Sequence, residues 1–339
     1  MLSNRTIFVT VPCYNEETQI GKVVETMPAF VDKIVIVDDV SRDRTVGVVK
    51  ELARLDSRVV LIEHKVNGGV GKAIATGYIY CRDAGADVTV TMDGDGQMDP
   101  ADLESVVMPV IEDKVDYCKG NRFKYLGGLQ KIPPVRKFGN FVLSALTKIA
   151  SGYWHVTDSQ TGYRAISLAA LNQLDLNSIY PRYGVPNDIL VKLNIAGMRV
   201  GEVPVNPLYG VGEASKMRPA RVAYPILKLL FKLWLKRIFA RYVVQNGHPI
   251  VGVLAMAFVA LSLMALTTIY ILVETLRTEI IPKAALIVDG FAFVTSMQFF
   301  LSAMHMDYQY NEELCVRLEG PAHKNRRRSV VSHQHWPKE

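Results

Sequence analysis

The stretch VTVTMDGDGQ, residues 88–97, joins an apolar run to two carboxylates that follow it directly. Three similar apolar runs precede it and end in polar turns: Thr6–Val11, Lys33–Val37 and Val59–Glu63. Segments with helical spacing separate these runs: Glu17–Met27, Thr45–Leu55 and Lys72–Ala84. Buried strands that alternate with helices are typical of a parallel, doubly wound α/β sheet. Ligands of such sheets bind beyond the carboxyl ends of the strands, so the polar turns are expected to form one site.

The two acids of this stretch, Asp93 and Asp95, are candidate ligands of a divalent cation. Two carboxylates separated by one glycine can reach the same Mg²⁺ or Mn²⁺ and the diphosphate that the cation neutralises. Exposed turns often carry such pairs without any function. The position directly after a buried strand, at the same edge as the other polar turns, is what favours a metal site here.

Polar residues also follow the first two strands, in PCYNEE (residues 12–17) and VDDVSRD (residues 37–43). Carboxylates there can accept hydrogen bonds from a base edge or from ribose hydroxyls, and Tyr14 offers a face for stacking. Asn15 and Ser41 could equally begin the next helices as N-caps, and the two roles are compatible.

The glycine-rich segment NGGVGKA, residues 67–73, is not a P-loop. That motif requires glycine at position 66 and a hydroxyl at position 73, where this chain has Val66 and Ala73. Gly69 and Gly71 are not followed by a third glycine at position 74, so the dinucleotide fingerprint is also missing. We interpret the segment as a tight strand-to-helix turn that brings Lys72 close to a nucleotide.

Composition limits the class of protein. The chain has 339 residues, of which 49% are hydrophobic, and a formal net charge of +6. Much of the basic excess lies after residue 198 and flanks apolar segments, which favours an anionic membrane surface over nucleic acid. The four cysteines are scattered without a CxxC pair, so neither a zinc site nor a disulfide framework is indicated. The N-terminus lacks the pattern of a signal peptide, and the first domain is expected in the cytosol.

The last third of the chain predicts a membrane anchor. Residues 218–242 place Lys228, Lys232 and Lys236 on one helical face among Leu, Phe and Trp, as in an interfacial helix, although an ordinary buried helix is the alternative. Pro249–Val273 contains no charge and Ala284–Met304 contains only an acid at position 289, so both are long enough and apolar enough to span a membrane. The predicted division is 1–217 catalytic, 218–246 interfacial, 247–306 transmembrane hairpin and 307–339 basic tail.

Charges at the ends of the hairpin predict its orientation. Basic residues precede the first span and follow the second, at Asn325–Arg328, so the positive-inside rule places both termini and the first domain in the cytoplasm. Asp289 would lie within the second span, where an acid is either functional or close to an interface. It would prefer a protein neighbour, which makes a homo-oligomer plausible.

Taken in order and spacing, PCYNEE, VDDVSRDRT, NGGVGKA and MDGDGQMDP resemble family 2 glycosyltransferases of GT-A fold. GNRF (residues 120–123), PPVRKFGN (133–140) and DSQTGYRAIS (158–167) resemble the branch of that family that acts on polyprenyl phosphates, with dolichol-phosphate mannose synthase as a member. The resemblance covers residues 5–217. It implies a Rossmann-like, mostly parallel α/β catalytic domain and a membrane-bound transferase that uses a nucleotide-sugar donor.

The resemblance also implies roles for single residues. Asp93 and Asp95 would hold Mg²⁺ or Mn²⁺ together with Gln97, and Arg122 and Arg136 would bind the acceptor phosphate. The donor nucleotide would contact Pro12, Tyr14, Glu16 and Asp39. The sequence departs from the family at Val40, where glycine is common, and in PNDIL (residues 186–190), where mannose synthases carry a glutamate-containing segment. These departures bear on the base contact and on the identity of the sugar.

Three functions remain open from the sequence. The first is inverting transfer of a sugar to a polyprenyl phosphate, which is already ionised and needs only arginines to orient it. The second is transfer to a hydroxyl, as in glycolipid or polysaccharide synthesis, which needs a carboxylate base such as Asp158 or Asp188. The third is a membrane scaffold with a degenerate transferase domain, against which the intact pair of Asp93 and Asp95 argues.

Overall fold

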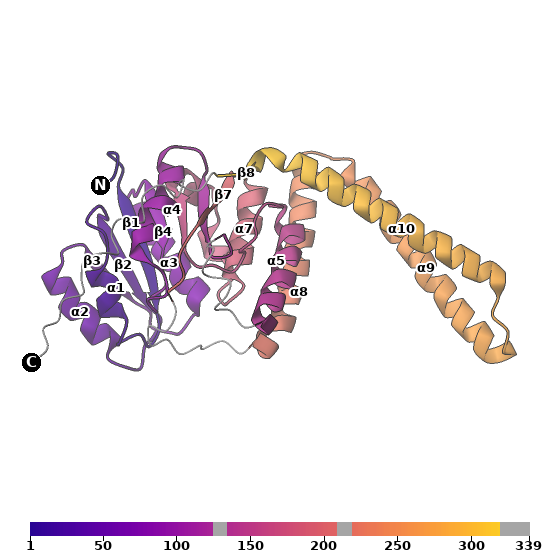
Figure 1. Ribbon diagram of the computed structural model, residues 1–339, viewed down its shortest axis with the longest axis horizontal. Coiled ribbons are helices and arrows are strands. Elements are labelled where there is room, and N and C mark those ends of the chain that lie inside the picture. The colour runs from indigo at the N-terminus through magenta and orange to yellow at the C-terminus, as the bar shows by residue number, and fades with distance from the viewer. Residues whose placement is uncertain (125–133, 209–218, 319–339) are drawn as a thin grey trace, which may run out of the picture.

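The computed structural model describes residues 1–124, 134–208 and 219–318. Within them, one sheet of eight strands forms the centre of the N-terminal domain, in the order β3-β2-β1-β4-β6-β5-β7-β8 (Figure 1). The strands are β1 (Ile7–Cys13), β2 (Lys33–Asp38), β3 (Val59–Glu63), β4 (Val88–Thr91), β5 (Tyr117–Asn121), β6 (Arg164–Ser167), β7 (Val200–Pro204) and β8 (Cys315–Val316). The first four coincide closely with the apolar runs read from the sequence.

The sheet is mostly parallel, as predicted. Strands β1 to β4 pair in parallel, as do β5 with β7 and β7 with β8. Only β6 runs antiparallel to its two neighbours, β4 and β5, in the part of the chain that the structure describes. This insertion brings the segment before β6, residues 157–163, to the same edge as the carboxyl ends of β4 and β5.

Helices cover both faces of the sheet. Buried residues of α1, α2 and α4 form a core with one face, while α3, α6 and α7 pack against the other. These helices are α1 (Ile20–Glu25), α2 (Thr45–Leu55), α3 (Val70–Asp83), α4 (Leu103–Ile111), α6 (Leu168–Gln173) and α7 (Val185–Ile195). The arrangement confirms the doubly wound α/β class.

Two helices lie side by side between this domain and the C-terminal hairpin (Figure 1): α5 (Pro134–Ser151) and α8 (Pro219–Arg237). A π-helix, Ile238–Gln245, continues α8. The outer side of α8 exposes Leu227, Phe231 and Leu235, which are spaced four residues apart. This apolar stripe beside the lysines has the pattern expected of a helix at a membrane surface.

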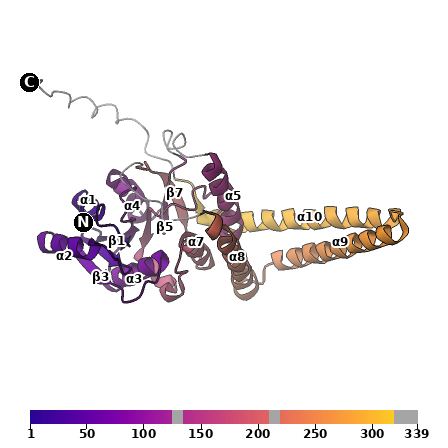
Figure 2. The same cartoon turned by 90° about the horizontal axis from the view of Figure 1, so that it is seen from below.

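The hairpin of α9 (Ile250–Thr278) and α10 (Lys283–Tyr310) extends away from the domain (Figure 2). Both helices are long enough and apolar enough to cross a membrane, and their apolar windows are only 22% and 11% buried. A helix in the core of a soluble protein would be mostly buried, and a signal sequence would lie near the N-terminus. The hairpin therefore has the exposure expected of segments that face lipid.

After the hairpin the chain returns to the N-terminal domain. Strand β8 extends the sheet beside β7, and a Cβ placed on Gly201 would lie 2.6 Å from Leu318 Cδ1. Helix α10 continues to Tyr310, and the end of the transmembrane hairpin at residue 306 stays a prediction. Both ends of the hairpin thus lie on the same side, next to the sheet.

A buried polar junction fixes these ends. Arg237 of α8 and Asp307 of α10 form a two-pronged ion pair, with Nη1–Oδ1 at 2.7 Å and Nη2–Oδ2 at 3.2 Å. Trp154 Nε1 donates to Asp307 Oδ2 at 3.1 Å, and the Tyr242 hydroxyl donates to Oδ1 at 2.5 Å. The Arg237 guanidinium also donates to the carbonyls of residues 149 and 150 in the last turn of α5.

Asp289 finds partners within the hairpin itself. Its Oδ1 accepts hydrogen bonds from the hydroxyls of Thr267 at 2.6 Å and Thr268 at 2.8 Å, both on α9. These contacts join α9 to α10 within the predicted span. Association with a second copy through this region stays a prediction.

Candidate active site

The turns after β1, β2 and β4 meet at one edge of the sheet. Asn15 N donates to Ser41 Oγ at 2.9 Å, and Glu16 N donates to Thr45 Oγ1 at 2.8 Å. A Cβ on Gly94 would lie 2.7 Å from Cys13 Sγ and 3.6 Å from Glu16 Cγ. The glycine between the two acids therefore allows the acidic turn to pack directly against the turn that carries Pro12, Tyr14 and Glu16.

Asp93 lies in a strongly perturbed environment. Burial raises its pKa to about 6, helped by the negative charge of Asp95, while the positive charges of Arg164 and Arg122 act in the opposite direction. A Cβ on Gly162 would lie 2.5 Å from Asp93 Oδ2, so that glycine leaves room for the carboxylate. Two acids that disfavour each other's ionisation form a local excess of negative charge that a cation would relieve.

The residues at this point fit a metal shared with a diphosphate. No cluster of three or more His, Cys, Asp and Glu side chains suited to a metal occurs in the described residues. Mg²⁺ is commonly bound by one or two carboxylates together with substrate phosphates, so the pair of Asp93 and Asp95 suffices. Gln97 follows in the same turn, where its N–H donates to Asp95 Oδ1 at 3.0 Å and its carbonyl accepts from Leu208 N.

The carboxylate of Asp39 is occupied by the glycine-rich turn. It accepts from Gly68 N at 2.8 Å and Gly69 N at 2.7 Å, and it contacts His64 Nδ1 at 2.8 Å. Asp38 is also buried, and its Oδ2 accepts from Ser41 N at 3.0 Å. Its Oδ1 has no hydrogen-bond partner within the described part of the chain. Asp38, which the sequence did not single out, therefore places a buried carboxylate oxygen without a described partner near this edge.

Lys72 stands at the start of α3, directly after this turn, and is exposed. Gly69 has φ of 85°, which favours glycine, and a Cβ on Gly71 would lie 2.0 Å from the Tyr180 carbonyl oxygen. Gly69 therefore allows the tight turn, and Gly71 allows the backbone at Tyr180 to approach closely. This geometry matches the strand-to-helix turn read from the sequence.

Val40 has a left-handed backbone, with φ of 66°. This conformation is a genuine outlier for a β-branched residue. Asn15, on the facing turn, has φ of 56°, which asparagine adopts more readily. The chain keeps the shape of the turn at Val40 at the cost of local strain.

Arg122 and Asp158 form the second part of the site. Asp158 Oδ2 accepts from Arg122 Nε at 2.8 Å and from its backbone N at 3.1 Å, while Oδ1 accepts from Nη2 at 2.9 Å. Burial opposes ionisation of Asp158, but the hydrogen bonds and charge of Arg122 outweigh it and lower the pKa. Asp158 is 1% exposed, whereas the Arg122 side chain is 27% exposed. The buried carboxylate of Asp158 therefore positions the Arg122 guanidinium, and the Arg122 side chain is still partly exposed to solvent.

The other predicted residues lie as follows. Arg136 belongs to α5, but its side chain falls outside the described residues. Asp188, the alternative base, is buried in α7, where it forms an ion pair with Lys192 and accepts from Tyr180 N at 2.8 Å.

Gly162 and Arg164 of the DSQTGYRAIS segment lie close to Asp93, although the sequence assigned them no role. Arg164 is fully buried, donates to the Tyr78 hydroxyl at 3.1 Å, and is close enough to Asp93 to favour its ionised form. The DSQTGYRAIS motif indicated that this segment contributes to the site. The spacing of residues alone does not distinguish a buried arginine in a strand from an arginine on the surface.

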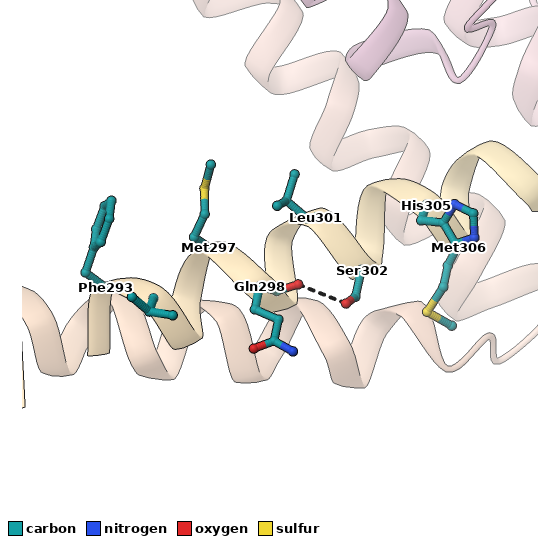
Figure 3. Close-up of a pocket in the computed structure, with 8 residues that line it drawn as sticks. Phe293, Met297, Gln298, Leu301, Ser302, His305 and Met306 are labelled. Atoms are coloured by element: carbon teal, nitrogen blue, oxygen red, sulfur yellow. Dashed lines mark hydrogen bonds between the residues drawn. The ribbon is translucent and has the colours of Figure 1, made fainter. Parts of the chain in front are cut away.

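A separate groove lies along α10, away from this edge (Figure 3). Phe293, Met297 and Leu301 point to one side of the helix there, and the Ser302 hydroxyl donates to the Gln298 carbonyl at 2.9 Å. Five of its eight lining residues are apolar, as expected for a surface within the predicted span: Phe293, Val294, Met297, Leu301 and Met306.

Comparison with known proteins identifies relatives of the chain. The sequence profile of Glycosyl transferase family 2 matches residues 8–175. The UDP-N-acetylglucosamine–dolichyl-phosphate N-acetylglucosaminyltransferase of Methanococcus voltae is 33% identical over 250 residues, which cover 70% of this chain and 99% of that protein. The undecaprenyl-phosphate mannosyltransferase of Micrococcus luteus is 28% identical over 204 residues, covering 59% of this chain and 82% of that protein.

A solved structure supports the fold. Glucosyl-3-phosphoglycerate synthase from Mycobacterium tuberculosis, in complex with Mn²⁺, UDP and glucosyl-3-phosphoglycerate, aligns with a TM-score of 0.50 and 18% identity, covering 69% of this chain and 80% of that one. At this identity the likeness concerns architecture. The matching profile and the 33% identity to the Methanococcus protein, 99% of which is covered, lead to one conclusion: the chain belongs to glycosyl transferase family 2.

Proposed function

We propose that the protein transfers a sugar from a nucleotide-sugar donor to a polyprenyl phosphate at a membrane, with inversion at the anomeric carbon. The observation that carries this proposal is the pairing of both candidate bases. Asp158 is held by Arg122, and Asp188 by Lys192. A hydroxyl acceptor needs a base to remove its proton, whereas a lipid phosphate is already ionised. The named relatives that act on dolichyl and undecaprenyl phosphates support the same acceptor class.

The acceptor phosphate would bind at Arg122. Its guanidinium is positioned by Asp158 and is 27% exposed, and a guanidinium group is well suited to bind phosphate oxygens. Arg136 would contribute a second positive charge. The apolar stripe of α8 and the hairpin would bring the domain to the lipid surface, where a polyprenyl chain is anchored.

The donor would bind across the turns after β1, β2 and β4. Pro12, Tyr14 and Glu16 would line the nucleotide, with Lys72 near its phosphates. Asp39, whose carboxylate also accepts hydrogen bonds from the glycine-rich turn, would lie beside the base or ribose.

Asp93 and Asp95, with Gln97, would hold Mg²⁺ or Mn²⁺ on the donor diphosphate. Such a cation neutralises the charge that develops on the leaving group. The protein's own part is to orient donor and acceptor in line. A single displacement by the phosphate oxygen inverts the anomeric carbon, and the nucleoside diphosphate leaves with the bonding electrons.

For orientation in the membrane, we propose that the N-terminal domain and both termini lie on the cytoplasmic side. The pairing of β8 with β7 supports placing both ends of the hairpin beside the domain. The basic residues that flank the two helices support the cytoplasmic side.

The test uses the purified full chain in detergent with Mn²⁺, radiolabelled UDP- and GDP-sugars, and either undecaprenyl phosphate or undecaprenol. Label in the organic phase is expected only with the phosphate, and it should be lost in Asp95→Ala. Arg122→Gln should raise the KM for the lipid phosphate at least ten-fold, whereas the surface control Arg82→Gln should not. Label that appears with undecaprenol would overturn the lipid-phosphate proposal in favour of a hydroxyl acceptor.

A further inference from the structure

Three charged side chains lie in one row across the interior of the sheet. Lys119 of β5 is in register with Arg164 of β6 on one side and with Glu202 of β7 on the other. None of the three is more than 1% exposed. Buried charges are costly unless they are paired or hydrogen-bonded, so the partners of this row indicate what it does.

Glu202 holds the first half of the segment that precedes β6. Its Oε1 accepts from the backbone N–H groups of Thr157 at 3.0 Å and Asp158 at 3.1 Å. Its Oε2 accepts from Thr157 Oγ1 at 3.0 Å and from Asn121 Nδ2 at 2.6 Å. Four donors thus converge on a single carboxylate.

Lys119 holds the second half of the same segment. Its Nζ donates to the carbonyl of Thr161 at 2.9 Å and to that of Ser159 at 3.4 Å. A carboxylate only accepts and an ammonium only donates, so the two charges fit the amides and the carbonyls of this segment respectively. The pair forms a clamp on residues 157–161, which we call the acceptor segment.

The acceptor segment carries Asp158, and Asp158 sets the direction of the Arg122 guanidinium. Arg122 also follows Asn121 directly, which is bonded to Glu202. We propose that Glu202 and Lys119 are positioning residues for the acceptor phosphate: by fixing the backbone of residues 157–161 they orient Arg122 toward it. This inference rests on the proposed function, because it assigns the phosphate to Arg122.

The geometry explains why the acid is needed at position 202. Asn121 Oδ1 accepts from Phe123 N at 2.8 Å and Lys124 N at 3.2 Å, which fixes the orientation of its amide. Its Nδ2 must therefore point at Glu202. In Glu202→Gln the new amide would either face this donor with its own NH₂ group or lose its bonds to the backbone of the acceptor segment.

The first test is kinetic. Glu202→Gln is expected to raise the KM for undecaprenyl phosphate about ten-fold, equivalent to about 1.4 kcal/mol, and to leave the KM for the donor within about two-fold. Lys119→Met should give the same selective rise. The matched control is Asp116→Asn, which removes an acid bonded to Arg199 at the opposite end of the β5–β7 pair, and should leave the acceptor KM unchanged.

A double-mutant cycle decides whether Glu202 acts through Arg122. In an Arg122→Ala background, Glu202→Gln is expected to add no further rise in the acceptor KM, because the group it orients is gone. A second ten-fold rise in that background, or equal rises in both KM values in the parent, would overturn the proposal and leave Glu202 a general stabiliser.

Hydrogen exchange tests the clamp without any turnover. Glu202→Gln should speed amide exchange in a peptide covering residues 155–162 and leave that of residues 88–97 unchanged; unchanged exchange at 155–162 would overturn the clamp. If Glu202→Gln does not fold, Thr157→Val removes one of the four donors and is expected to give a smaller effect in the same peptide. A wild-type protein that transfers no sugar to lipid phosphate refutes the proposed function, whereas the exchange result still decides the clamp.

Discussion

Asp307→Leu is expected to be among the most damaging single changes in the chain, although Asp307 lies far from the acidic turn. The change leaves the Arg237 guanidinium without its carboxylate, and Arg237 is fully buried. Removing one partner of a buried ion pair costs about 3–5 kcal/mol, because the remaining charge is uncompensated. At about 2–4 °C per kcal/mol for a domain of 150–250 residues, the expected fall in Tm is about 6–20 °C.

The assay is thermal unfolding of the purified full chain in one detergent, followed by tryptophan fluorescence. Glu63→Gln serves as the control, because it breaks an exposed pair with Lys50. Exposed pairs contribute about 0–1 kcal/mol, so the control should shift Tm by at most a few degrees.

The double variant Arg237→Met with Asp307→Leu tests the cause. It removes both charges, so it should cost at least 2 kcal/mol less than the sum of the two single changes. It should still be destabilised relative to wild type, since the carbonyls of residues 149 and 150 at the end of α5 lose their donor. Additive losses, or an Asp307→Leu protein as stable as the Glu63→Gln control, would refute the reasoning.

Three further outcomes follow from the site and its surroundings. Gly162→Ala places a methyl 2.5 Å from Asp93 Oδ2, so Mn²⁺-dependent binding of donor, measured by calorimetry, should weaken at least ten-fold while Tm changes little. Val40→Gly relieves a left-handed backbone that costs about 1–2 kcal/mol for a side-chain-bearing residue, so it should raise Tm or leave it unchanged; a clear fall would contradict the strain. Burial lowers the pKa of His155 to about 4 from 6.5, so the unfolded chain binds more protons between these values and stability falls as the pH drops through that window. In denaturant titrations, the loss of unfolding free energy between pH 7 and pH 4.5 should be about 2 kcal/mol smaller in His155→Gln than in the wild type.

The strands and helices of the first half were predictable because each buried strand is a continuous apolar run that ends in a polar turn. Val59–Glu63 and Thr45–Leu55 were placed to the residue. The antiparallel β6 and the two-residue β8 were not predictable, because both strands are short and neither forms a continuous apolar run. Their pairing is decided by tertiary contacts, such as those that hold the end of α10.

The motifs indicate which residues line the candidate site, but not how those residues are hydrogen-bonded. The motifs named Asp93, Arg122 and Asp158, but not that the carboxylate of Asp158 would be committed to Arg122. Nor could spacing reveal that Asp39 accepts from backbone amides while Asp38 Oδ1 has no described partner. Sequence patterns identify which chemical groups reach an edge, whereas hydrogen-bond partners depend on the three-dimensional packing that brings distant segments together.

The return of the chain after the hairpin makes the hairpin topologically an insertion into the N-terminal domain. The rings of His248 and Tyr310, at its two ends, are centred 4.9 Å apart, and β8 completes the sheet beyond them. The hairpin is therefore joined to the N-terminal domain by two covalent attachments instead of one. In the proposed membrane arrangement, the domain does not rotate on a single tether, so the fold, and not the length of a linker, sets the height of Arg122 above the membrane.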